Sequence, residues 1–182
     1  NSYAKQTIAH NNITIDQYSQ SHAHFKQADQ NYGLKHFFVG NDLKTDVDYQ
    51  IQAMSAFSYD HYPDSKMQRS VFLFKNKMLN FPLMIDVFRI VSDCSHQYDY
   101  SHHYNGQIIR TNFAYNYNNK LYPLGNQSGY QHLWSLAQAK IKHDAMISWL
   151  QGSRFYSWIG DCDIEDHEII FTHLGANDPS FN

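Results

Sequence analysis

Short runs in which polar and apolar residues alternate, separated by turn-forming residues, recur along the whole chain. The clearest are residues 50–54 (QIQAM) and 69–75 (RSVFLFK). Strict alternation places the apolar side chains on one face of a strand and the polar ones on the other. Further β-rich runs cover residues 13–15, 34–39, 49–56, 70–74, 83–91, 107–117, 133–141, 145–150, 154–159 and 168–174. Many short strands at this spacing predict an all-β fold, an antiparallel β-sandwich.

One segment has two interpretations. Residues 133–141 fit the strand pattern, but apolar side chains such as Leu133, Leu136 and Ala137 also follow helical spacing. One short helix there would leave the all-β class unchanged. No internal repeat, low-complexity stretch or Gly/Ser-rich linker marks a domain boundary. A chain of 182 residues can form one substantial core, so we expect a single domain over residues 1–182.

Composition narrows the possible partners. A hydrophobic fraction of 42% is that of an ordinary folded protein. The net charge of −3 comes without the clustered Lys and Arg that nucleic-acid binding requires. The longest apolar run, residues 81–91, is broken by Pro82, Asp86 and Arg89, so it does not approach a membrane-spanning helix. We therefore expect neither nucleic acid nor a membrane as a partner.

Two histidines separated by one residue, His22 and His24, form the first candidate site. The chain has 14 Tyr and 12 His, side chains that suit sugar or metal sites. On a strand, His22 and His24 would point to the same face. With Asp42 and His96, His24 would make a two-histidine, one-carboxylate site of the kind that binds zinc. Asp29 is an alternative carboxylate, and the alternative for the whole set is that these side chains are solvated.

Residues 96–104 (HQYDYSHHY) form the densest cluster of histidines and tyrosines in the chain. On a strand, His96, Tyr98, Tyr100 and His102 would share one face. This arrangement predicts either a functional surface or a polar strand edge with aromatic cross-strand pairs.

Residues 57–63 (FSYDHYP) follow an alternating run, at a point where loops commonly present functional groups. Tyr59 and Tyr62 are candidates for proton transfer, although most tyrosines in a tyrosine-rich chain are structural. His10 stands before the short run 13–15. It could bond locally, or it could hold a substrate carboxylate by aiming a donor at the charge.

Several segments resemble, in the same order, the C-terminal β-sheet region of heparinase II/III-like lyases. Residues 3–16 (YAKQTIAHNNITID) resemble the start of that region. Later segments resemble alginate and oligoalginate lyases of polysaccharide lyase family seventeen, namely 69–71 (RSV), 85–89 (IDVFR), 96–100 (HQYDY), 102–106 (HHYNG) and 175–179 (GANDP). The resemblance covers nearly the whole chain. It implies cleavage of uronic-acid glycosides by β-elimination.

The resemblance also implies partners. Members of this family join an N-terminal α/α toroid to a C-terminal β-sandwich, with the active site in the cleft between them. We therefore expect residues 1–182 to be part of a longer chain and to be inactive without the toroid. The expected substrate is an anionic polysaccharide or oligosaccharide. Alginate or oligoalginate is the first expectation, and a glycosaminoglycan of the heparin type is the alternative. The expected location is periplasmic or secreted.

Residue roles follow from the same resemblance. In the family's His-x-His, the first histidine reaches the cleft and the second binds metal, which implies that His22 is catalytic and His24 is a ligand. Asp42 resembles the carboxylate ligand, and Tyr59 resembles the catalytic tyrosine. His96 is the third expected ligand. The expected ligands suit zinc. This divalent metal would have a structural role and would orient His22.

Alternatives remain for the tyrosine and for the function. The composition of residues 40–48 leaves the alignment of this part of the chain with the family motif ambiguous. Tyr62 therefore competes with Tyr59 for the catalytic role. His10 and Tyr62 are the expected substrate-binding residues. The alternatives to a lyase are a carbohydrate-binding module without catalysis and a structural β-domain that stabilises a neighbouring toroid.

Overall fold

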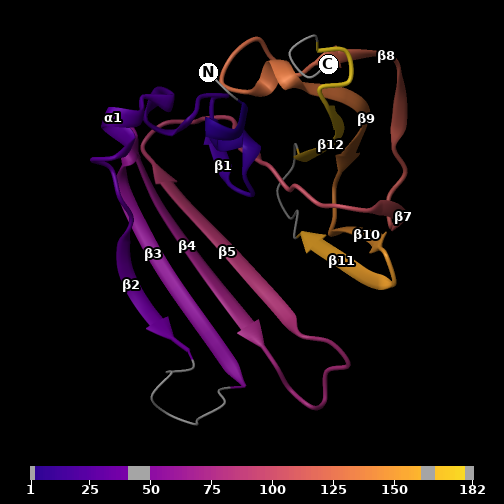
Figure 1. Cartoon of the computed structure of the whole chain (residues 1–182), viewed down its shortest axis with the longest axis horizontal. Helices are drawn as coiled ribbons and strands as arrows, with labels where there is room; N and C mark the ends of the chain where they lie inside the picture. Colours follow the sequence, from indigo (N-terminus) through magenta and orange to yellow (C-terminus); the bar gives the residue numbers. More distant parts are fainter. Residues whose placement is uncertain (1–2, 41–49, 161–166, 179–182) are drawn as a thin grey trace. The chain divides into compact units, whose positions relative to one another are not determined.

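The computed structural model describes residues 3–40, 50–160 and 167–178. Antiparallel strands form most of these residues, and the one α-helix among them, α1 (Phe25–Ala28), has a single turn (Figure 1). The prediction of an all-β, antiparallel, sandwich-like fold is therefore confirmed. None of the helices in the described ranges is long and apolar enough to cross a membrane.

The chain forms two compact units. The first contains residues 1–19 and 98–182, and the second contains residues 20–97. This division lies inside the range 1–182 that the sequence predicts as one domain.

The second unit is built around one four-stranded antiparallel sheet in the order β2-β3-β4-β5. Its strands are β2 (Leu34–Val39), β3 (Ile51–Tyr62), β4 (Ser65–Phe74) and β5 (Leu83–Ser92). The 3-10 turn η3 (Gln20–Ala23) precedes α1. Figure 1 shows β3, β4 and β5 as long neighbouring strands. The runs at 50–54 and 69–75 overlap the start of β3 and the C-terminal part of β4, so both segments are strands as expected.

Two irregularities interrupt the hydrogen-bonded ladder of this sheet, one between β2 and β3 and one between β3 and β4. The register between β2 and β3 shifts between Lys35 and Phe37, which leaves His36 as an extra residue. The register between β3 and β4 shifts between Ser58 and Tyr62. Such β-bulges bend a strand and redirect side chains, and they are common beside functional sites.

The first unit contains two three-stranded sheets, with strand orders β11-β10-β7 and β12-β9-β8, and a two-stranded pair. The strands are β1 (Ile13–Ile15), β6 (Tyr98–Tyr100), β7 (Gln107–Thr111), β8 (Asn116–Pro123), β9 (Leu133–Ile141), β10 (Ala145–Gln151), β11 (Arg154–Gly160) and β12 (His167–Leu174). Three short 3-10 turns accompany them: η1 (Tyr3–Lys5), η2 (Thr7–Ala9) and η4 (Tyr130–His132). Buried Ala139, Ile141 and Ala145 pack with Trp158 and Ile169, so the core includes residues of both three-stranded sheets.

Residues 133–141 form strand β9, so the helical interpretation of this segment is wrong. Exposure alternates along the strand with period two, and its buried positions include Ser135 at 0% and Ala137 at 1%. A small polar side chain holds a core position here, which explains why apolar spacing alone also fitted a helix.

Strands β1 and β6 join the two chain segments of the first unit. Ile13 pairs with Tyr100 and Ile15 with Tyr98. Thr14, between them, is 0% exposed, and its hydroxyl contacts that of Tyr130. This pairing ties the start of the chain to its second half.

Candidate functional site

A pocket of about 440 Å³ opens on the four-stranded sheet of the second unit. Tyr59, the tyrosine expected to be catalytic, lines this pocket and is 51% exposed. It stands where the register of β3 is irregular. The other lining residues are His36, Phe57, Lys66, Met67, Gln68, Arg89 and Val91. The pocket therefore combines a phenol with two cationic side chains and several hydrogen-bonding groups.

Strand register defines the face that carries the pocket. Phe57 on β3 lies opposite Gln68 on β4, and Gln68 lies opposite Arg89 on β5. Opposed residues on neighbouring strands point to the same face, so these three form a row across the sheet. Lys66 lies two residues before Gln68, and its Nζ is 5.9 Å from the centroid of the Tyr59 ring. A cation therefore stands beside the phenol.

A hydrogen-bonded chain supports the same face. The side-chain nitrogen of Gln68 lies 3.1 Å from Nδ1 of His36 and 3.1 Å from Oγ of Ser55. Ser55 is 3% exposed, and its hydroxyl also contacts that of Ser70 at 2.8 Å. The bulged histidine is thus connected through Gln68 to buried Ser55 and its half-buried partner Ser70 in the centre of the sheet.

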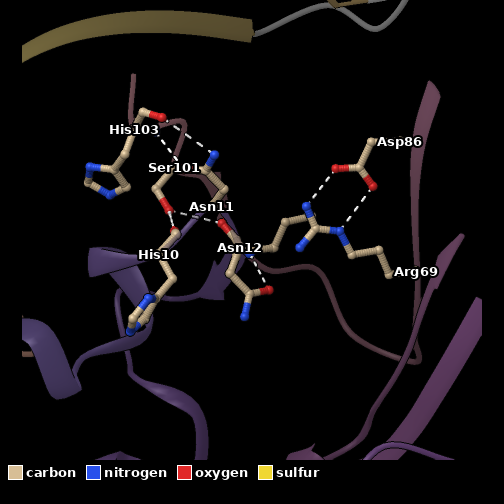
Figure 2. Close-up of polar contacts among 8 residues, drawn as sticks. His10, Asn11, Asn12, Arg69, Asp86, Ser101 and His103 are labelled. Carbon is tan, nitrogen blue, oxygen red and sulfur yellow. Dashed lines mark hydrogen bonds and ion pairs between the residues drawn. The ribbon is translucent and has the colours of Figure 1, made fainter. Parts of the chain in front are cut away.

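The two arginines of β4 and β5 differ in their surroundings. Arg69 forms a bidentate pair with Asp86, with Nε–Oδ1 and Nη2–Oδ2 distances of 3.0 and 2.6 Å (Figure 2). Arg89 is exposed and forms no ion pair with a residue in the described part of the chain. The positive charge of Arg89 is therefore available in the pocket.

The bulged end of β3 carries a second polar contact. Oγ of Ser58 contacts Nδ1 of His61. Burial lowers the pKa of His61 below the ordinary histidine value, and the nearby Asp60 carboxylate opposes this with a smaller effect. Burial therefore favours the neutral form of His61.

Asn31 connects this bulge to the segment that contains the His-x-His pair. Its side-chain amide donates to the backbone carbonyl of Asp60 at 2.8 Å and to Oγ of Ser21 at 3.0 Å. Asp60 follows Tyr59 in the sequence, and Ser21 precedes His22. The structure therefore brings the two segments expected to be catalytic together, whereas the side chain of His22 lies outside what it describes.

The structure describes two of the three expected metal ligands. His24 is exposed, His96 is half-buried, and Asp42 lies outside the described residues. Among the described residues, no three His, Cys, Asp or Glu side chains gather closely enough to hold a metal ion. The triad of His24, Asp42 and His96 therefore stays a prediction.

The two expected substrate-binding residues have different environments. His10 is exposed, and its Nε2 lies 3.0 Å from the backbone carbonyl of Ala4. His10 belongs to the first unit, and Tyr62 to the second. Tyr62 is only 6% exposed. Their roles toward substrate stay predictions.

Part of the cluster at 96–104 has structural contacts in the first unit. The backbone nitrogen of His103 donates to Oδ1 of Asn11 at 2.6 Å, and its Nε2 lies 2.8 Å from the carbonyl of Ile8. Ser101 donates through its hydroxyl to the carbonyl of Asn12 at 3.1 Å (Figure 2). These residues hold the strand pair β1–β6 to the turns that precede it.

A larger cavity of about 900 Å³ lies in the first unit and is rich in aromatic side chains. Trp149, on its wall, lies 5.4 Å from the ring of Tyr104 and 5.8 Å from that of His102. The described lining of the cavity contains Glu168, whose carboxylate would repel an anionic ligand, and three histidines, but neither Lys nor Arg. The pocket of the second unit is therefore the better candidate site for an anionic sugar.

Sequence reasoning missed Lys66, Gln68 and Arg89. The available signal was the period-two spacing of Lys66 and Gln68, which places both on the face of β4 that meets Phe57. Pairing of β4 with β5, which adds Arg89, is a long-range contact that alternation alone does not specify.

No protein-family model matches the chain. The chain is 32% identical over 183 residues to an alginate lyase of Stenotrophomonas maltophilia. It is 31% identical over 187 residues to an exo-oligoalginate lyase of Saccharophagus degradans. Both alignments cover 100% of this chain. The chain is thus similar over its whole length to part of two alginate lyases. It spans about a quarter of the length of these curated relatives, 24% of each.

Proposed function

We propose that this chain contributes part of the active site of a polysaccharide lyase that cleaves uronic-acid glycosides by β-elimination. Alginate or oligoalginate is the proposed substrate. The observation that carries the proposal is the position of Tyr59 in a pocket where the Nζ of Lys66 lies 5.9 Å from the centroid of its ring. Similarity over the whole chain to two alginate lyases supports the same reaction class.

The chemistry of β-elimination explains why such a pocket is suitable. A base removes the proton at C5, next to the uronate carboxylate. The electron pair forms the C4–C5 double bond, and the bond from C4 to the glycosidic oxygen breaks. That oxygen leaves with a proton, and no water is consumed. Negative charge builds up on the carboxylate during proton removal, so fixed cations and donors around it lower the barrier.

Tyr59 is the proposed proton-transfer residue. Its exposed phenol is accessible from the pocket, and Lys66 places a positive charge beside it. A correctly placed acid or base contributes about a hundredfold to ten-thousandfold in rate. His22, whose segment is tied to the Tyr59 bulge through Asn31, is the proposed donor to the substrate carboxylate. His10 and Tyr62 are the proposed additional substrate contacts.

A structural divalent metal remains part of the proposal. His24, Asp42 and His96 would hold it, and imidazole and carboxylate ligands suit zinc. When bound, the ion would orient the segment that carries His22. Proton transfer by Tyr59 does not require the ion.

The proposal also concerns the rest of the protein. An α/α toroid would supply the opposite wall of the active site, so residues 1–182 alone are expected to be inactive. A periplasmic or secreted location fits a polymeric substrate, and cell fractionation would test it.

Activity of the full-length protein on alginate tests the proposal. The product of β-elimination contains a C4–C5 double bond conjugated to the carboxylate, so ultraviolet absorbance reports turnover. Tyr59→Phe and His22→Ala should each lower kcat by about a hundredfold or more while circular dichroism stays unchanged. Tyr32→Phe, at a tyrosine that is 71% exposed and outside the pocket, is the matched control.

Full activity of both variants would refute the catalytic role and favour a structural domain. Alginate binding without any unsaturated product would instead indicate a carbohydrate-binding module. Turnover by residues 1–182 alone would exclude a shared active site.

A further inference from the structure

The row Phe57, Gln68 and Arg89 places a guanidinium one row away from Lys66 on the same sheet face. Side chains two residues apart along a strand are separated by roughly 7 Å. Lys66, whose Nζ is 5.9 Å from the Tyr59 ring, lies in the row of Val91, whereas Arg89 lies in the row of Gln68. The pocket therefore contains two positively charged side chains, Lys66 next to the phenol of Tyr59 and Arg89 in the neighbouring row.

Arg89 is chemically suited to bind a carboxylate. Its guanidinium has a planar fork of donors that matches the two oxygens of a carboxylate. Arg69, on the neighbouring strand, already uses this geometry with Asp86. Arg89 forms no such pair within the part of the chain that the structure describes. Its bidentate donor set is therefore open to a ligand.

His36, on the edge strand β2, adds a second hydrogen-bonding group to the lining of the pocket. The amide nitrogen of Gln68 donates to Nδ1 of His36, which makes Nδ1 an acceptor. A neutral imidazole that accepts at Nδ1 has its proton on Nε2, so Nε2 becomes a donor. The bulge in β2 is what gives His36 this position, because it is the extra residue of the ladder.

We propose that Arg89, assisted by Nε2–H of His36, forms a subsite that binds the carboxylate of a uronate residue, separate from the position beside Tyr59. The ligand class rests on the proposed function. Arg89 is thus a specificity-determining residue that selects charged over neutral sugars. Gln68 is a positioning residue, because it acts by holding His36.

Steady-state kinetics of the full-length protein with a mannuronate trisaccharide test this subsite. Arg89→Gln should raise KM by about tenfold to a hundredfold, the loss typical of a hydrogen-bonded charge pair, and should change kcat much less. Arg89→Lys keeps the charge but loses the planar, two-pronged donor set of the guanidinium. Its KM should therefore lie between those of the wild type and Arg89→Gln. Arg154→Gln, at an exposed arginine of the first unit, is the matched control.

Calorimetric binding separates this inference from the proposed function. In a Tyr59→Phe background, Arg89→Gln should weaken binding of the trisaccharide by the same factor. It should leave binding of the carboxyl-reduced trisaccharide unchanged. Unchanged KM and affinity in Arg89→Gln would overturn the subsite even if the protein forms unsaturated product. Weakened uronate binding in Arg89→Gln, in a protein that forms no unsaturated product, would support the subsite and refute the lyase.

Discussion

The side-chain amide of Asn31 donates a hydrogen bond to the backbone carbonyl of Asp60 over 2.8 Å. The same nitrogen donates to Ser21, so it connects the turn before α1 to the bulged end of β3. Asp60 belongs to the residues that interrupt pairing between β3 and β4. Asn31 therefore supplies a contact to backbone that the regular ladder does not satisfy.

Replacing Asn31 by Ala should destabilise the second unit. Two hydrogen bonds are lost, each worth roughly 0.5 to 1.5 kcal/mol, so the free energy of unfolding should fall by about 1 to 3 kcal/mol. Urea denaturation of the full-length protein measures this change. Asn80→Ala, at an exposed loop position, is the control. Equal stability of the two variants would show that Asn31 does not hold the bulge.

The environment of His61 predicts a pH-dependent stability. Burial lowers its pKa below 6.5, so the unfolded chain takes up a proton at this site more readily than the folded chain. Stability due to neutral His61 is therefore complete above about pH 6.5 and is lost as the pH falls through the folded-state pKa. Free energies of unfolding measured across this range should decline more steeply for the wild type than for His61→Gln. Parallel curves would exclude the effect.

Tyr130 is expected to stabilise the first unit through its hydroxyl. Tyr130 is 2% exposed, and its hydroxyl contacts Thr14 and donates to Oδ2 of Asp99 at 2.5 Å. Tyr130→Phe should lower the free energy of unfolding by about 1.5 to 3 kcal/mol, the range for a bond to a charged group. Thermal or chemical denaturation measures the change, with Tyr32→Phe as the control. A loss no larger than that of Tyr32→Phe would contradict the role of this hydroxyl.

Metal content tests the proposed triad directly. Elemental mass spectrometry of the full-length protein should find one zinc ion per chain, and His24→Ala or Asp42→Ala should remove it. Asp29→Ala separates the two carboxylate candidates, because it should retain the metal if Asp42 is the ligand. Metal retained in both His24→Ala and Asp42→Ala would rule out this site.

The strands of the second unit were predictable because β-rich runs bounded by turn residues mark them. The runs at 34–39 and 83–91 match β2 and β5, and those at 50–54 and 69–75 overlap parts of β3 and β4. Neither bulge was predictable, because an extra residue is defined only against the partner strand. The helical alternative for 133–141 failed because small side chains such as Ser135 occupy core positions of β9.

Tyr59 was chosen as a candidate from its local segment and from the family resemblance, and the structure places it in a pocket. Its neighbours Lys66 and Arg89 come from other strands, and their contacts depend on register rather than on sequence proximity. Both interpretations of the cluster at 96–104 stay open, because the Ser101 and His103 side chains bond to backbone carbonyls, whereas His102 and Tyr104 line the larger cavity. The sequence shows which residue types are present, whereas strand topology determines which of them come into contact.

The pairing of β1 with β6 gives the chain the connectivity of a host domain with an inserted guest. Ile15 and Tyr98 are direct partners, so residues 16–97 depart from and return to adjacent points of the host. A loop of this length costs little more closure entropy than a shorter one, since that cost grows only logarithmically. The host fold therefore tolerates wide variation in the guest.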